Sequence, residues 1–291
     1  MSARARWGHE PLPCPRPVPE GSRMVLGHRG VPSLAPENTL SSIRQAARAG
    51  ATWVEIDVDV LGDGTPIVIH DSSLDRTTNR SGPYDHLSQA DLHGIDAGSW
   101  FIAEDGSRPY SGEPLPTLGQ VLEMVAAEGL SVNVEMKPCE AGARVCAELV
   151  DAVARHLDQF AATAPGSQAV ASSFNPLLLD RLGRRRPATR LALLMAAGMP
   201  TGAWRSYAEM LGVEAINPAD EGLERALVEE IRALGYGVNV WTINSPQRCG
   251  GALLMGGLRH IHRPDPRVRT PRYGNVIPWA QQPRSGDSPP F

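Results

Sequence analysis

The sequence predicts an α/β protein whose parallel strands close into a barrel. Short runs of apolar and β-branched residues recur along the chain, as expected of strands buried on both faces. Segments with helical spacing of apolar residues separate most of these runs, and such alternation predicts a parallel sheet with right-handed crossovers. Roughly eight such units fit a closed barrel of about 250 residues better than an open sheet. The chain has 291 residues, 42% of them hydrophobic, which is enough for one such domain.

Nine apolar runs are the expected strands. In chain order they span residues 24–30, 53–60, 65–71, 131–138, 168–174, 190–195, 214–219, 237–243 and, with the weakest signal, 259–264. Six segments have the spacing of helices: residues 38–49, 117–128, 140–160, 176–185, 221–234 and 246–255. Side chains suited to cap helix N-termini are Asn38, Thr117, Asn175 and Ser245, and glycines suited to end helices are Gly50, Gly129 and Gly235.

One main domain is expected at residues 23–268, between two terminal tails. Residues 1–22 are too rich in proline for a helix or a central strand, and residues 269–291 lack a sustained period. Residues 72–116 interrupt the alternation, because they are polar and rich in Gly, Pro, Asp and Ser, with a short helical pattern at 88–93. We expect this segment to be an insertion, or cap, beside the barrel mouth after the second strand region.

Composition and charge argue against several classes of function. A net charge of -4 supplies no positive field for general nucleic-acid binding. The four cysteines have neither metal-site spacing nor the density of a disulfide framework, which favours free thiols in a reducing compartment. No apolar run is long enough to span a bilayer. We therefore expect a cytoplasmic protein with no nucleic-acid partner and no integral membrane association. Its oligomeric state is not predicted.

Alternating carboxylates mark the strand expected at residues 53–60. In an extended strand Glu55, Asp57 and Asp59 point to one face, and the apolar residues between them point to the other. In a parallel barrel the apolar set packs under the helices and the acidic set faces the interior or the mouth. Glu135 ends a neighbouring apolar run in the same manner. Carboxylates this close repel one another, so they predict a hard divalent cation, Mg²⁺ or Ca²⁺, or a cationic partner such as Lys137.

Two histidines and an arginine lie at the ends of apolar runs, where a barrel carries its chemistry. His28 and His70, beside an acidic cluster, suit a general base and a general acid for a hydrolysis. Arg29 offers paired planar donors for a phosphate or a carboxylate. The alternative for Arg29 is a structural ion pair with Glu37.

Three motifs resemble the glycerophosphodiester phosphodiesterase family: GHRGVPSLAPENTL, VEIDVDVLGDGTPIVIHDSSLDRTTN and VEMKP, in this order. The similarity runs from residue 24 to residue 137 and continues more weakly through SSFNP and VWTIN to residue 265. It implies a distorted barrel of the triosephosphate-isomerase (TIM) type with a small inserted domain. It also implies hydrolysis of a small-molecule phosphodiester, a glycerophosphodiester, to sn-glycerol 3-phosphate and an alcohol.

The resemblance implies which residues carry out the reaction. It makes His28 and His70 the catalytic pair, and Glu55, Asp57 and Glu135 the ligands of one divalent cation. One histidine would deprotonate water or the substrate's own free hydroxyl, while the other protonates the departing alkoxide. The sequence leaves open which histidine has which role.

Other residues receive substrate-binding or undecided roles from the resemblance. It places Arg29 and Lys137 against the substrate phosphate. Trp241 resembles an aromatic residue on the glycerol side of the site, with a position in the core as an equal alternative. Asp59 and Asp71 are adjacent to the motif residues, and Asp59 is favoured as an interior ion-pair partner.

The last strand departs from the family pattern. Relatives are expected to have a Gly-Val-Asp-Gly-Ile stretch before Thr-Asp and proline, whereas this chain has GLRHIHRPDP from Gly257 to Pro266. Surface or structural roles are favoured for His260 and His262. Because the loop after the last strand helps to form the pocket, the change bears on substrate scope.

Two other functions remain open. One is a phospholipase D-like or specialised phosphodiesterase that acts on a lysolipid or a metabolite diester. The other is a non-catalytic phosphodiester-binding protein built on the same barrel. The presence of both histidines and of all three proposed metal carboxylates argues against this second alternative.

Overall fold

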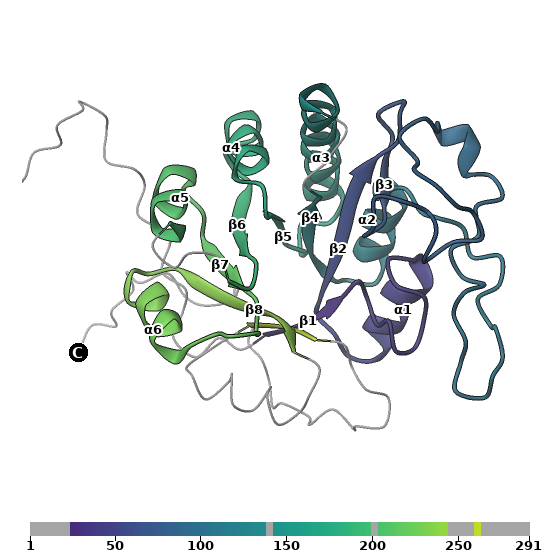
Figure 1. Cartoon of the computed structure of the whole chain (residues 1–291), viewed down its shortest axis with the longest axis horizontal. Coiled ribbons are helices and arrows are strands. Elements are labelled where there is room, and N and C mark those ends of the chain that lie inside the picture. Colours follow the sequence, from purple (N-terminus) through teal and green to yellow (C-terminus); the bar gives the residue numbers. More distant parts are fainter. Residues whose placement is uncertain (1–23, 138–141, 199–202, 244–258, 263–291) are drawn as a thin grey trace, which may run out of the picture.

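A nine-stranded sheet forms the centre of the molecule, and eight of its strands close a parallel barrel (Figure 1). The computed structural model describes residues 24–137, 142–198, 203–243 and 259–262. In spatial order the barrel strands are β1 (Met24–His28), β2 (Trp53–Val60), β4 (Ser131–Met136), β5 (Ala169–Ser173), β6 (Arg190–Met195), β7 (Ala215–Pro218), β8 (Gly237–Ile243) and β9 (Arg259–His262). Neighbouring strands run parallel, and β1 pairs with both β2 and β9, which closes the ring. The predicted barrel fold is therefore confirmed.

Helices surround the barrel (Figure 1). They are α1 (Leu40–Arg48), α2 (Leu118–Ala127), α3 (Ala143–Thr163), α4 (Pro176–Arg185), α5 (Trp204–Leu211) and α6 (Arg225–Ala233). Thr117 and Asn175 cap α2 and α4 with their side chains, as predicted, but the cap of α1 is Thr39 rather than Asn38. Helix α5 was not predicted. It has eight residues and buries Trp204 and Ala208, and so short a helix does not show a recognisable helical period in the sequence. Within the described ranges, none of the helices combines the length and the apolarity of a bilayer span.

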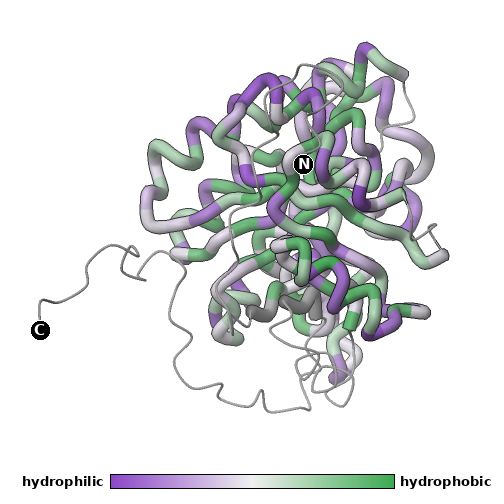
Figure 2. Tube along the Cα trace, turned by 90° about the vertical axis from the view of Figure 1, so that its left-hand side faces the viewer, coloured by the Kyte–Doolittle hydropathy of each residue, from purple (hydrophilic) through white to green (hydrophobic). Residues whose placement is uncertain are grey.

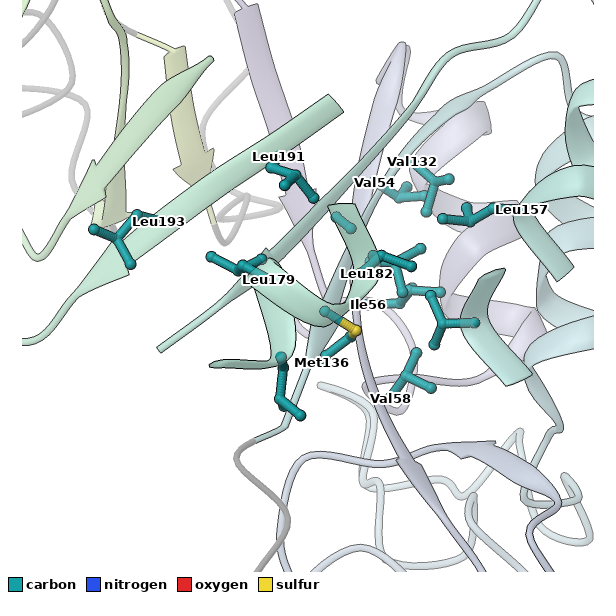
Figure 3. Close-up of a cluster of buried hydrophobic side chains, with 14 of the residues drawn as sticks. Val54, Ile56, Val58, Val132, Met136, Leu157, Leu179, Leu182, Leu191 and Leu193 are labelled. Carbon is teal, nitrogen blue, oxygen red and sulfur yellow. The ribbon is translucent and has the colours of Figure 1, made fainter. Parts of the chain in front are cut away.

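The main apolar core lies between the outer face of the barrel and the helices. Val54, Ile56 and Val58 of β2 have no exposed surface, and they belong to one cluster with Leu157 of α3 and Leu182 of α4 (Figure 3). Burial of each such side chain stabilises the fold by roughly 1.5–3 kcal/mol. Figure 2 shows hydrophobic residues gathered in the middle of the molecule, with hydrophilic and hydrophobic residues alternating along the outer segments.

The insertion after β2 has a small core of its own. The run predicted at residues 65–71 forms β3 (Pro66–Val68), which pairs antiparallel with β2 and is not a strand of the ring. Eight buried apolar residues pack together under the insertion: Leu61, Ile67, Ile69, Leu74, Tyr84, Ile95, Ala97 and Leu115. A single 3-10 turn, η1 (Gln89–Leu92), occupies the segment with the short helical pattern. Glu113 accepts hydrogen bonds from the backbone and hydroxyl of Ser41, which fastens the insertion to α1.

Several predictions fall outside the described residues. These are the two terminal tails, the helix at 246–255 with its cap Ser245, and the side chains of His260 and His262. The backbone at 259–262 forms β9, so the weakest of the predicted strands is present.

Candidate active site

Three carboxylates, here called the carboxylate triad, meet at the barrel mouth. Glu55 and Asp57 belong to β2 and Glu135 to β4, and the parallel register sets Asp57 beside Glu135. Oxygen atoms of all three lie within 4.8 Å of one another. Their exposed fractions are 1%, 1% and 8%, so these acidic groups are buried as deeply as core residues. The structure thus brings together the three side chains that were predicted as metal ligands.

Burial and mutual repulsion oppose full ionisation of the carboxylate triad. Burial, Asp57 and Glu135 raise the pKa of Glu55 well above its usual value. Burial and Asp57 likewise raise the pKa of Glu135 to about 7. For Asp57 the effect of burial is outweighed by Arg29 and Lys137, and the pKa falls to about 2. Asp57 is therefore firmly ionised, and a further positive charge would favour the charged forms of the other two.

A strained loop between β1 and α1 delivers Arg29 and Asn38 to the triad. Their φ angles are 54° and 59°, in the left-handed region that residues other than glycine rarely adopt. The N–H of Arg29 donates to Glu55 Oε2 at 3.0 Å. Asn38 Nδ2 donates to Asp57 Oδ2 at 2.8 Å, and Asn38 Oδ1 accepts from the Asp57 N–H at 3.2 Å. Gly30 has φ 82°, and a Cβ there would overlap the first turn of α1, so the loop requires glycine.

Two basic side chains neutralise part of the triad. Arg29 Nε lies 3.2 Å from Asp57 Oδ2, and Arg29 Nη1 donates to Glu37 Oε1 at 2.7 Å. Lys137 Nζ lies 2.9 Å from Glu135 Oε1 and 3.3 Å from Asp57 Oδ1. Burial alone would lower the pKa of both basic groups, but the surrounding carboxylates raise it. The ion pair between Arg29 and Glu37, which was the structural alternative, is present, and Arg29 also reaches the triad.

The two histidines reach the mouth by different routes. His28 ends β1, and its Nε2 lies 3.8 Å from Glu55 Oε2. His70 follows β3, and the antiparallel return of β3 along β2 brings it back to the mouth, where the N–H of Ile69 donates to the C=O of Asp57. Burial lowers the pKa of His70 and outweighs the opposing attraction of Asp57. The register of β1 and β2 pairs His28 with Glu55, and His70 directly follows Ile69, which bonds to Asp57, so both histidines lie beside the triad.

The ionisable side chains around the mouth include more acidic than basic groups, which favours a divalent cation. The carboxylates are Glu37, Glu55, Asp57, Asp71 and Glu135, and the basic side chains are Arg29, Arg76 and Lys137. When all are charged, five negative groups face three positive ones, and two negative charges remain. Among the described residues, Glu55 Oε1 is buried and has no hydrogen-bond donor. A hard divalent cation therefore fits the triad by charge, by its oxygen ligands and by this unused acceptor.

Sequence reasoning missed Arg76, which contacts Asp71 and Glu37 beside the mouth. Arg76 lies in an irregular segment of the insertion, where no period marks the side chains that face the barrel. The signal available was its place in the motif VEIDVDVLGDGTPIVIHDSSLDRTTN, which also contains His70 and Asp71. Asp59 lies further along β2 than the triad, and its Oδ2 accepts a hydrogen bond from Tyr84 of the insertion at 2.9 Å.

Trp241 lies on β8, which is separated from β2 in the ring by β9 and β1. Its Nε1 donates to the C=O of Asn217 at 2.8 Å, and its ring packs edge-on against Phe174 with centroids 5.4 Å apart. The ring is partly buried against the apolar cluster of Leu26 and Trp53 in the barrel interior. Its role in substrate binding stays a prediction.

A parallel barrel whose mouth combines a buried carboxylate triad with basic and histidine side chains defines a class of barrel proteins with a polar, charged site at the mouth, where the triad has the ligand chemistry to hold a divalent cation. The sequence model of the Glycerophosphoryl diester phosphodiesterase family matches residues 28–261. The chain therefore belongs to this family of enzymes, as its motifs predicted.

Individual relatives agree with this assignment. A phosphodiesterase of Oleispira antarctica, solved in complex with the product sn-glycerol-3-phosphate, is 32% identical with a TM-score of 0.75, and the match covers 82% of this chain and 92% of that one. The glycerophosphodiester phosphodiesterase of Caldanaerobacter subterraneus is 27% identical over 245 residues, 84% of this chain and 95% of the relative. The human glycerophosphoinositol inositolphosphodiesterase GDPD2 is 38% identical over 147 residues. That match covers 43% of this chain and 27% of the human protein.

Proposed function

We propose that the protein hydrolyses glycerophosphodiesters to sn-glycerol 3-phosphate and an alcohol, with a divalent cation held by Glu55, Asp57 and Glu135. The observation that carries this proposal is the buried carboxylate triad flanked by Arg29 and Lys137 in a member of this enzyme family. The Oleispira relative, which was solved with sn-glycerol-3-phosphate as its product, supports the choice of product.

Arg29 and Lys137 would hold the phosphate of the substrate. Both are permanently charged at neutral pH, because the carboxylates around them raise their pKa values. The planar guanidinium of Arg29 can donate to two phosphoryl oxygens, whereas the ammonium of Lys137 acts as a point charge. A divalent cation, when bound to the triad, supplies further positive charge to the phosphoryl oxygens.

The contact between His70 and Asp71 supports a role for His70 as the general base. Asp71 Oδ1 lies 2.6 Å from His70 Nδ1. Hydrogen bonds from Arg76, followed by the contact with His70, hold the pKa of Asp71 well below its usual range, so the carboxylate is ionised and can only accept a hydrogen bond. His70 Nδ1 therefore keeps its proton, and the lone pair of Nε2 is left to accept one from the nucleophile. His28 would then protonate the departing alkoxide.

The similarity to human GDPD2 favours a second candidate reaction. The name of that relative specifies an inositolphosphodiesterase. The two sequences are 38% identical over 147 aligned residues, which are 43% of this chain. In such a reaction the bond on the glycerol side of the phosphate would break, and the products from glycerophosphoinositol would be glycerol and inositol phosphate. The two candidates therefore differ in which phosphoester bond is broken.

Product analysis with three diesters tests both candidates. The purified protein is given glycerophosphocholine, glycerophosphoethanolamine or glycerophosphoinositol, with Mg²⁺, Ca²⁺ or EDTA. Cation-dependent release of sn-glycerol 3-phosphate, lost in His28→Ala and retained in the exposed control His93→Ala, is the expected result. Release of inositol phosphate instead would select the second candidate.

A lysophospholipid arm separates the specialised phosphodiesterase from the leading proposal. Cleavage of the lysophospholipid alone would select the phospholipase D-like reaction. Binding of the diesters without any product, from folded protein supplied with cation, would overturn the enzymatic proposal and leave a phosphodiester-binding function.

A further inference from the structure

Arg76 links two carboxylates at the edge of the barrel mouth. It lies within the insertion, in the irregular segment after β3. Its Nε and Nη2 donate to Asp71 at 2.6 and 2.9 Å, and its Nη1 and Nη2 donate to Glu37 at 3.0 and 2.8 Å. All three guanidinium nitrogens are therefore used, in a planar arrangement that lysine cannot reproduce.

The contact with Asp71 connects Arg76 to His70. Asp71 Oδ2 accepts from Arg76 Nε, while Asp71 Oδ1 faces both Arg76 Nη2 and His70 Nδ1. A carboxylate held in this way fixes both the orientation and the tautomer of the imidazole. Without the guanidinium, Asp71 is free to rotate, and the ring of His70 loses its fixed partner.

The contact with Glu37 connects Arg76 to Arg29. Glu37 Oε1 accepts from Arg76 Nη2 and also from Arg29 Nη1, and Arg29 Nε continues to Asp57. A chain of charge-assisted contacts therefore runs from the proposed general base, through the insertion, to the proposed phosphate-binding arginine.

The side chain of Arg76 is too exposed for its ion pairs to contribute much to folding stability. Its side chain is 45% exposed and that of Asp71 is 28% exposed, and ion pairs at such positions contribute little to folding stability. Glu37 is buried, but it keeps Arg29 as a partner when Arg76 is removed. We therefore expect the protein to fold without the guanidinium of Arg76.

We propose that Arg76 is a positioning residue, which holds His70 and Arg29 in their working orientations through Asp71 and Glu37. The effect on turnover rests on the proposed function, whereas the effect on the His70 ring is measurable without substrate. Loss of Arg76 should lower kcat through His70, which acts in the chemical step, and should raise KM by a smaller factor through Arg29, which binds the phosphate.

The kinetic test compares Arg76→Ala and Arg76→Lys with the wild-type protein. The matched control is Arg225→Ala, which removes an exposed arginine paired with Glu229 on α6. We expect kcat to fall by roughly 10- to 100-fold in Arg76→Ala, since a small displacement of a catalytic group has an effect of this size. Arg76→Lys should restore little, added guanidinium should restore part of the kcat of Arg76→Ala, and the control should match wild type. If Arg76→Ala does not fold, Arg76→Lys carries the same comparison.

The spectroscopic test follows the tautomer of His70 by nitrogen NMR in metal-free protein labelled at histidine. His70→Gln assigns the signals. We expect the form with the proton on Nδ1 to dominate in wild type and in Arg225→Ala, and to lose its dominance in Arg76→Ala.

Each result points to one conclusion. An active wild-type protein with unchanged kcat in Arg76→Ala would overturn the positioning role while leaving the proposed function intact. An inactive wild-type protein would overturn the proposed function; the tautomer measurement would then decide the positioning of His70, and an unchanged tautomer in Arg76→Ala would overturn it.

Discussion

The two faces of β2 are equally buried but have opposite effects on stability. On the outer face Val54, Ile56 and Val58 pack under the helices with no exposed surface, and on the inner face Glu55 and Asp57 are 1% exposed beside a third carboxylate. Burial of the apolar set stabilises the barrel, whereas burial of the acidic set costs free energy that opposite charges must offset. The outer face of β2 therefore stabilises the fold. The inner face provides the side chains of the candidate site and lowers the stability of the fold.

Asp57→Asn should have the largest effect, and the effect should be on activity. The substitution removes the ionised group that Arg29, Lys137 and the proposed cation share, while Asn38 keeps a hydrogen-bonding partner. We expect kcat/KM for glycerol 3-phosphate release to fall by about 10³-fold or more. The control is Asp180→Asn, an exposed carboxylate paired with Arg184 on α4. Activity within tenfold of wild type would show that the triad is not the centre of the reaction.

Ile56→Ala, on the neighbouring position of the same strand, should act on stability alone. The side chain has no exposed surface, so truncation leaves a cavity, and we expect the free energy of unfolding to fall by about 2–5 kcal/mol. Urea unfolding measures this change, and the activity per folded molecule should stay at the wild-type level. Ile102→Ala, at a side chain that is 57% exposed, should change stability by less than about 0.5 kcal/mol. A large fall in kcat of folded Ile56→Ala would mean that the two faces are not separable.

The sequence pattern was sufficient to predict both faces of β2, because alternation with period two is a local property of a strand. The same holds for β4, where Glu135 ends an apolar run, and for the caps Thr117 and Asn175. Positions that depend on tertiary contacts were not predictable in this way. Asn38 is a residue type suited to cap a helix, but the cap of α1 is Thr39. Asn38 has a left-handed backbone conformation, and its side-chain amide donates to Asp57 instead.

The orientation of β3 and the position of Arg76 show a second limit. An apolar run of three residues has no direction, so its antiparallel pairing with β2 follows from the short connection between them rather than from its composition. Arg76 is brought to Glu37 by that pairing together with the irregular segment after it. The motif residues on barrel strands were therefore predictable as a group, whereas a residue placed by the insertion required the structure.

A divalent cation should stabilise the protein, and Glu55 should decide the effect. At a cation concentration about 100 times its dissociation constant, binding to the folded form adds about 2.7 kcal/mol, which thermal unfolding with Mg²⁺, Ca²⁺ or EDTA would detect. Glu55→Gln should lose this response. In EDTA the same variant should be at least as stable as wild type, since burial and its neighbours raise the pKa of Glu55 and disfavour its charge. Glu123→Gln, an exposed change on α2, should keep the cation response. A full response in Glu55→Gln would place the cation elsewhere.

The titration of His70 should show the smallest effect, and its direction tests the same balance of burial and charge. Burial lowers the pKa of His70 from 6.5 more strongly than the attraction of Asp57 raises it, with Arg29 and Lys137 acting in the same direction as burial. A lowered pKa means that the neutral, proton-accepting form persists as the pH falls, so NMR of metal-free protein should give a midpoint below 6.5. Because the contact with Asp71 raises the pKa, Asp71→Asn should move the midpoint further down. A midpoint above 6.5 would mean that the negative charge of the inner face outweighs burial at this position, and His70 would then be charged near neutral pH and suited to the role of the acid.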